Sequence, residues 1–299
     1  MLRIASIFAA AALATPAAAQ VPPQDVPPTE LGSVLVEGRR LSETIERFVD
    51  DIVAPPVGRG PSRWDKQVCV GVANLQREAA QVIIDQVSRI ALEAGIEPSD
   101  PGCRPSILVI ATSDGQAMAR GLVDAKRRAF LPYYAGGSRS ARALERFQAA
   151  DTPVRWWHVG VPVTETGEIA VRLPGYDAPW IKNAGSRLNT SIRNELRRAF
   201  VIVDLDKMEG VTFQQLGDYI GMVAMAQIDP DAETAAYDTV LNLFDAPGAV
   251  NGLTGWDRSY LSALYNAELN RRAPSHQGGE VAGLMLRDIL RAREPDAAE

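Results

Sequence analysis

Apolar and polar positions in the first third of the chain follow the periods of a strand, a helix and a second strand. Valines alternate with other residues through 66–73, which predicts a strand. Apolar residues recur at helical spacing through 76–94, and Gly95 follows as a helix-ending residue. The run PSILVIAT at 105–112 is almost continuously apolar, as in a central strand buried on both faces. This order predicts two parallel strands joined by a crossover helix.

The remaining strands and helices are predicted from the same periods and from turn residues. Short apolar runs predict a strand at 34–36 and a buried strand at 198–204. Residues 153–163 and 168–173 lie on either side of a Glu-Thr-Gly turn, which predicts a hairpin. Helical spacing predicts helices at 42–53, 115–130, 138–150 and 279–291.

The stretch TFQQLGDYIGMVAMAQ at 212–227 has the strongest helix signals in the chain. Thr212 and Gln215 have the spacing of a capping box, in which each side chain satisfies an unpaired backbone donor. Apolar residues at helical spacing follow them. Gly217 and Gly221 form a second stripe almost without side chains, and each costs about 1 kcal/mol relative to Ala inside a helix. Such a stripe predicts that another element packs closely against this face, and a tight helix crossing alone explains it.

The segments after this helix carry a resemblance to a known family. Residues 237–244 (YDTVLNLF) predict a turn, and residues 253–265 contain the pattern LT..D...L.ALY. Helix, turn and closing helix together resemble the C-terminal half of the metzincin zinc-protease domain over about residues 198–267. The resemblance implies an α/β (α+β) fold, with a zincin-like twisted mixed sheet packed with helices and an active-site-type helix at 212–227. It assigns the three zinc-binding histidine positions to Gly217, Gly221 and Gln227, the general base to Asp218, the glycine position to Ala224 and the methionine of the turn to Leu241.

The residues at those positions depart from the chemistry of the family. A catalytic zinc site of this type needs three imidazole ligands and an open position for water. The chain has two histidines, His158 and His276, and neither lies in the helix. Glycine has no donor atom, and Asp218 has no metal-bound water to deprotonate. We therefore expect no metal and no cofactor, and the resemblance implies a non-catalytic, pseudo-metalloprotease-like protein.

The ends of the chain read as targeting and flexible segments. Residues 1–19 have the three parts of a signal peptide: Arg3, an apolar run at 4–14 and a small-residue cleavage site ending near Ala19. No later apolar run reaches the roughly 18 residues of a transmembrane helix, so no transmembrane anchor is expected. The expected organisation is a Pro-rich disordered leader at 20–32, one α/β domain at 33–292 with a division near residue 195 left open, and a disordered tail at 293–299.

Charge and cysteine content agree with an exported protein. The formal net charge of -6 becomes -7 without Arg3, so the chain lacks the basic surface of a nucleic-acid-binding protein. Cys69 and Cys103 are the two cysteines, and in an oxidising compartment they predict one disulfide. The strong preference for Arg over Lys is typical of a GC-rich bacterial genome. We expect a periplasmic or secreted protein.

Aromatic residues suggest where a ligand would bind. Trp156 and Trp157 directly precede His158 on the strand predicted at 153–163, and Tyr176 and Trp180 lie in a loop rich in Pro and Gly. Such a cluster suits a peptide or glycan surface, although aromatic packing explains it equally well. The sequence therefore favours an exported, non-catalytic protein that binds a peptide, a glycan or an envelope partner. The alternatives are a periplasmic hydrolase with a non-standard site at Asp218 and His158, or a structural protein of the envelope.

Overall fold

The computed structural model describes residues 29–56, 58–132, 139–171 and 186–293. Residues Arg39–Glu299 form one compact unit, and Met1–Gly38 form a separate one. The signal peptide expected at 1–19 and most of the expected leader and tail lie outside the described residues. The division left open near residue 195 falls within a strand that pairs on both sides.

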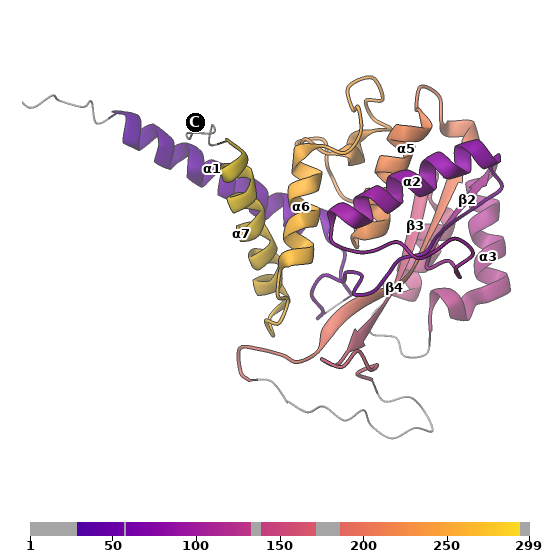
Figure 1. The fold of residues 1–299 in the computed structure, drawn as a ribbon, viewed down its shortest axis with the longest axis horizontal. Helices are drawn as coiled ribbons and strands as arrows, with labels where there is room; N and C mark the ends of the chain where they lie inside the picture. The colour runs from indigo at the N-terminus through magenta and orange to yellow at the C-terminus, as the bar shows by residue number, and fades with distance from the viewer. Residues whose placement is uncertain (1–28, 57, 133–138, 172–185, 294–299) are drawn as a thin grey trace, which may run out of the picture. The chain divides into compact units, whose positions relative to one another are not determined.

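A four-stranded mixed sheet forms the centre of the larger unit, in the order β1-β2-β4-β3 (Figure 1). Strands β1 (Val70–Ala73), β2 (Ile107–Thr112) and β4 (Arg193–Asp204) run parallel, and β3 (Val154–Val163) runs antiparallel at one edge. Helix α2 (Arg77–Glu93) joins β1 to β2. The predicted parallel pair with its connecting helix and the α/β class are therefore confirmed.

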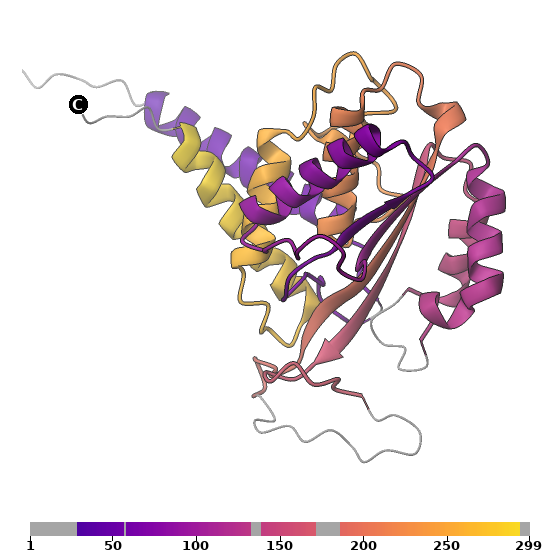
Figure 2. The same ribbon diagram turned by 45° about the vertical axis from the view of Figure 1, so that its right-hand side comes forward.

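Helices cover both faces of the sheet (Figure 2). Helix α2 and helix α5 (Phe213–Met225) pack on one face, where residues such as Ile83, Val201 and Ile220 belong to a single large core. Helices α3 (Gly115–Phe130) and α4 (Ala141–Ala149) pack on the other face against a smaller core that contains Phe200. The alternation of side chains along β4 explains this division, because Val201 and Phe200 point to opposite faces.

One predicted strand is wrong, and the described part of another is reduced to a single bridge. Residues 34–36 lie inside helix α1 (Thr29–Ile52), which also includes the end of the expected leader. In residues 168–171, the described part of the second, the two sides of the turn are joined only by an isolated bridge between Ile169 and Val163 and by backbone hydrogen bonds from Thr164 to Glu168 and from Ala170 to Pro162. Strand β4 instead gives β3 a long, largely apolar partner on its other edge.

Two further helices complete the unit. Helix α6 (Gly255–Asn266) and helix α7 (Pro274–Arg293) pack together, and α7 begins five residues before the predicted position. His276, just outside the helix predicted at 279–291, therefore lies in the first turn of α7. Single 3-10 turns lie at Leu205–Lys207 and Val240–Asn242. The second turn occupies the position where the metzincin resemblance places the methionine turn.

Cys69 and Cys103 form the predicted disulfide, which joins the segment before β1 to the loop before β2. The bond fits a protein that folds in an oxidising compartment. No helix in the described part of the chain is long and apolar enough to cross a membrane.

Candidate functional site

Helix α5 begins as the sequence predicted. The backbone N–H of Gln215 donates to the Thr212 hydroxyl at 3.2 Å, and the Gln215 side chain accepts from the Thr212 N–H at 2.9 Å. This capping box satisfies donors that a helix start otherwise leaves unpaired. From Leu216 to Met225 every residue of the helix is buried. Helix α5 follows β4 after a short 3-10 turn at Leu205–Lys207.

The two glycines of α5 pack against α2. A Cβ atom added to Gly217 would lie 2.8 Å from Cβ of Gln86, and one added to Gly221 would lie 2.2 Å from Cδ1 of Ile90. Helices α2 and α5 approach so closely because neither glycine carries a side chain. The two positions that the resemblance assigns to zinc-binding histidines therefore belong to a helix crossing, and side chains of α2 fill the space beside them.

The third of those positions, Gln227, is also inside the protein. Its side chain is buried, and neither its amide nitrogen nor its amide oxygen has a hydrogen-bond partner. Within the described ranges, no group of three or more His, Cys, Asp or Glu side chains is arranged to hold a metal ion.

Asp218 and His158 are each engaged with other groups. Oδ1 of Asp218 accepts from Arg89 at 2.7 Å, and Oδ2 accepts from the backbone N–H of Leu253 at 3.0 Å. Nε2 of His158 lies 2.7 Å from the carbonyl oxygen of Val223, which makes Nε2 the protonated nitrogen. The carboxylate thus ties α5 to α2 and to the segment before α6, and the imidazole ties β3 to α5. No hydrogen bond joins the two side chains.

Burial keeps His158 neutral at ordinary pH. Loss of solvation lowers its pKa from 6.5 to about 4, although the bond to Val223 opposes the shift. Because the unfolded chain takes up this proton near pH 6.5 and the folded protein does so only near pH 4, folding stability falls as the pH drops through that window. Across that window His158 lowers the free energy of unfolding by about 3 kcal/mol.

We expect His158→Gln to remove that part of the pH dependence, because a glutamine amide keeps a donor for Val223 but does not titrate. The measurement is urea unfolding of both proteins at steps between pH 7 and pH 4. The difference in free energy of unfolding between wild type and variant should shift by about 3 kcal/mol in favour of the variant as the pH falls. A difference that stays constant with pH would contradict a buried neutral imidazole.

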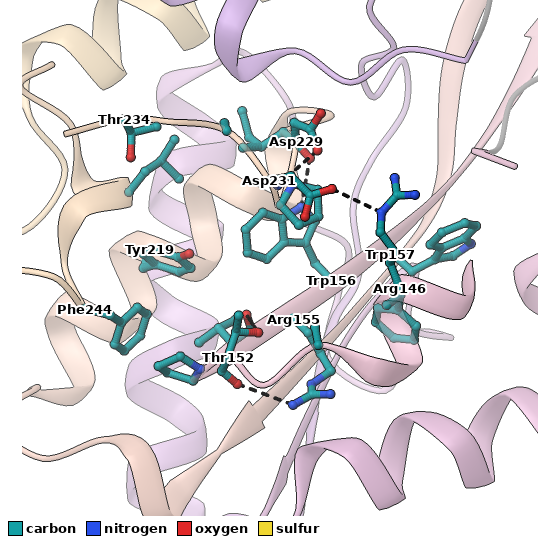
Figure 3. A pocket seen from close by; sticks show the side chains of 18 of the residues that line it. Arg146, Thr152, Arg155, Trp156, Trp157, Tyr219, Asp229, Asp231, Thr234 and Phe244 are labelled. Atoms are coloured by element: carbon teal, nitrogen blue, oxygen red, sulfur yellow. Dashed lines mark hydrogen bonds and ion pairs between the residues drawn. The ribbon is translucent and has the colours of Figure 1, made fainter. Parts of the chain in front are cut away.

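A pocket of about 280 Å³ lies along the outer edge of β3 (Figure 3). Its floor is the consecutive run from Thr152 to Trp157. One wall comes from α4 and the residues beside it. The other comes from residues 228–234 after α5, together with Tyr219, Leu241 and Phe244. This pocket, called the β3 groove below, lies beside helix α5 and not at its two glycines.

The main chain of β3 turns hydrogen-bonding groups into the groove. The N–H of Asp204 donates to the carbonyl of Pro153 at 2.8 Å, so Pro153 and every second residue after it form the hydrogen bonds to β4. Val154 and Trp156 are therefore the residues whose N–H and C=O groups face away from β4. The Val154 carbonyl accepts from the Thr152 hydroxyl at 3.0 Å. The two N–H groups and the Trp156 carbonyl have no partner in the described part of the chain.

Both predicted tryptophans line the groove, and both are held in place. Nε1 of Trp156 donates to the carbonyl of Ile228 at 3.0 Å, and Nε1 of Trp157 donates to the carbonyl of Phe130 at 2.9 Å. Edge-to-face ring contacts continue from Trp156 to Tyr219 and on to Phe244. The indoles thus present apolar ring surface to a ligand, with their polar atoms already satisfied. Tyr176 and Trp180 lie outside the described residues.

Sequence reasoning missed the walls of the groove. Arg139 and Arg146 come from the α4 side, and Asp229 and Asp231 come from the segment after α5. These residues lie far apart in the sequence and meet only because the sheet brings β3 between them. The Asp-Pro-Asp run after α5 was a visible signal for a turn, but nothing in it indicated a partner on α4.

Comparison of the chain with protein-family models, with curated proteins and with solved structures gave no match.

Proposed function

We propose that this protein is an exported, non-catalytic binding protein that holds an extended peptide segment along the open edge of β3. The observation that carries the proposal is the floor of the groove, where unpaired N–H groups of Val154 and Trp156 and the carbonyl of Trp156 face a pocket. An added strand supplies carbonyl and N–H groups at this spacing, and pockets on either side receive its alternating side chains.

A peptide suits these groups better than a glycan does. Sugar recognition by aromatic residues needs polar partners for the hydroxyl groups, and both indole N–H groups already donate to backbone carbonyls. The strand edge, by contrast, offers a regular row of main-chain donors and acceptors. Apolar rings of Trp156, Tyr219 and Phe244 then give contact surface to a side chain of the peptide.

The scaffold supports a protein of the zincin type without its metal. Strand β4 leads into the capped helix α5, and the turn with Leu241 follows, as the resemblance implies. Gly217 and Gly221, at histidine positions, are packed against α2. The signal-peptide pattern and the disulfide support export to the periplasm or the medium. A hydrolase that uses Asp218 and His158 together finds no support in their hydrogen bonds.

The test uses a pair of variants that differ in one N–H group. Val154→Ala and Val154→Pro both replace the branched valine side chain, but only the proline variant also loses the N–H that faces the groove. Proline is tolerated at an edge strand where its nitrogen points away from the ladder. The probe is a set of acetylated hexapeptides with alternating apolar and polar residues, and binding to the mature protein is measured by calorimetry.

We expect peptides from this set to bind Val154→Ala, and to bind Val154→Pro about fivefold to tenfold more weakly because one hydrogen bond is lost. Replacing one backbone amide of the tightest peptide by an N-methyl amide should cause a similar loss. Equal affinity for both variants, or no binding by any peptide, would exclude strand addition. Turnover of the peptides would exclude a non-catalytic protein.

A further inference from the structure

Ion pairs connect the two walls of the β3 groove. Nη2 of Arg139 lies 3.1 Å from Oδ1 of Asp229 and 3.9 Å from Oδ2 of Asp231. Nε of Arg146 lies 3.3 Å from the same Oδ2 of Asp231. Figure 3 shows Asp229 and Asp231 close to Trp156, with Arg146 opposite Asp231. The clasp is the name used here for the four side chains Arg139, Arg146, Asp229 and Asp231.

One side of the clasp is anchored. The backbone N–H of Asp229 donates to the carbonyl of Ile52 at 2.7 Å, and a bridge joins Ile228 to Val53. Oδ1 of Asp229 also accepts from the N–H of Asp231 at 3.1 Å, so the turn itself is held in shape. The backbone of the turn that carries the aspartates is therefore held to the end of α1.

The other side of the clasp is carried by a short helix. Helix α4 has nine residues and attaches to the sheet through Ala143, Leu144 and Phe147. Arg146 is on α4, and Arg139 lies immediately before the helix N-cap, Ser140. A helix of this length is only marginally stable alone, so its contacts with the sheet and with the aspartates decide its position.

The clasp lies at the Trp156 end of the groove. Nε1 of Trp156 donates to the carbonyl of Ile228, the residue next to Asp229, and Arg139 pairs with Asp229. A peptide that pairs with Trp156 must extend past this point. The ion pairs are partly exposed, with side-chain exposures of 20% for Arg139 and 28% for Asp229, so salt weakens them.

We infer that the clasp closes the β3 groove and must open before a peptide can pair with the main chain of Trp156. This inference rests on the proposed function for its biological meaning, but its physical content is independent of any ligand. If the clasp closes the groove, the unpaired N–H of Trp156 meets bulk solvent mainly when the walls separate, and its exchange with deuterium then reports opening. The fraction of molecules with an open groove should rise with ionic strength, and the rate of peptide association should rise with that fraction.

The experiment measures amide hydrogen exchange of the Trp156 segment in the mature protein without ligand, from about 0.02 M to about 1 M NaCl. In wild type we expect exchange to accelerate with salt. In the double variant Asp229→Asn, Asp231→Asn, exchange should be about fivefold faster at low salt and nearly independent of salt, because the pairs are gone. Asparagine at 229 keeps the acceptor for the Asp231 backbone, so the turn is retained.

Two further variants separate the clasp from general effects of charge. Glu93→Gln removes a carboxylate that pairs with Arg89 on α2, outside the groove, and should leave exchange at Trp156 unchanged. Arg146→Asp should accelerate exchange, and adding Asp231→Arg should slow it again by restoring an ion pair of reversed polarity.

The outcomes distinguish this inference from the proposed function. Exchange at Trp156 that is identical in wild type and in the double aspartate variant at every salt concentration would overturn the clasp, whether or not peptides bind. If exchange responds as expected but the protein binds no peptide, the inference about the clasp is supported and the proposed peptide ligand is excluded. Peptide association that is faster in the double variant would support both.

Discussion

Replacing Asp257 by alanine should lower the free energy of unfolding by about 4 kcal/mol, because its carboxylate is fully buried and accepts several hydrogen bonds. Oδ1 accepts from the Thr239 hydroxyl at 2.6 Å, and Oδ2 accepts from the Val240 N–H at 2.8 Å and from the Thr254 N–H and hydroxyl at 2.9 Å. Truncation would leave these donors buried without an acceptor. Burial raises the pKa of Asp257, although the hydrogen bonds it accepts oppose the shift.

The measurement is urea unfolding of Asp257→Ala beside Asp238→Ala. Asp238 is an exposed neighbour, and its replacement should change the free energy of unfolding by no more than about 0.5 kcal/mol. Because Asp257 fixes the turn that contains Leu241 to the start of α6, its loss should also loosen one wall of the β3 groove. A cost below about 1 kcal/mol would mean that water replaces the carboxylate as the acceptor.

Removing the disulfide should cost a similar amount. The bond between Cys69 and Cys103 joins positions that are 34 residues apart, and the chain-entropy model gives about 4 kcal/mol for a loop of that length. The variant with alanine at both positions, and wild type treated with a reductant, should therefore unfold roughly 10 °C below the oxidised protein. Calorimetry with and without reductant makes the comparison.

The double-alanine variant is its own control, since a reductant has no bond to break in it. Its midpoint should stay the same when the reductant is added, and the midpoint of wild type should fall to meet it. A wild-type midpoint that does not change on full reduction would show that the segment between β1 and β2 is held by packing alone, through residues such as Ile83 and Val109.

Local sequence patterns predicted an element correctly where the side chains of that one segment determine its secondary structure. The alternation before β1, the helical stripe of α2 and the continuous apolar run of β2 each predicted the observed element. The capping pair Thr212 and Gln215 predicted the start of α5 within one residue. In these places the period of the side chains and the chemistry of the ends agree, so few alternatives remained.

Pairing between segments could not be read in the same way. Residues 168–173 follow a good turn signal, yet β3 pairs with β4, which begins about thirty residues after β3 ends. A turn signal reports only local backbone preference, whereas the choice of partner depends on how much apolar surface each pairing buries. The glycines of α5 gave a correct warning of close packing, but only the structure identified α2 as the neighbour.

The sequence by itself determined the α/β class, the capped helix α5 and the cysteine pair, because periodicity, capping chemistry and redox logic act within short stretches of chain. Only the tertiary structure decided that Trp156 and Trp157 belong to the floor of a groove, that its walls carry paired charges, and that Asp218 and His158 serve different contacts. Those facts depend on residues far apart in the chain being brought together by the sheet, and neither the spacing nor the type of a residue contains that information.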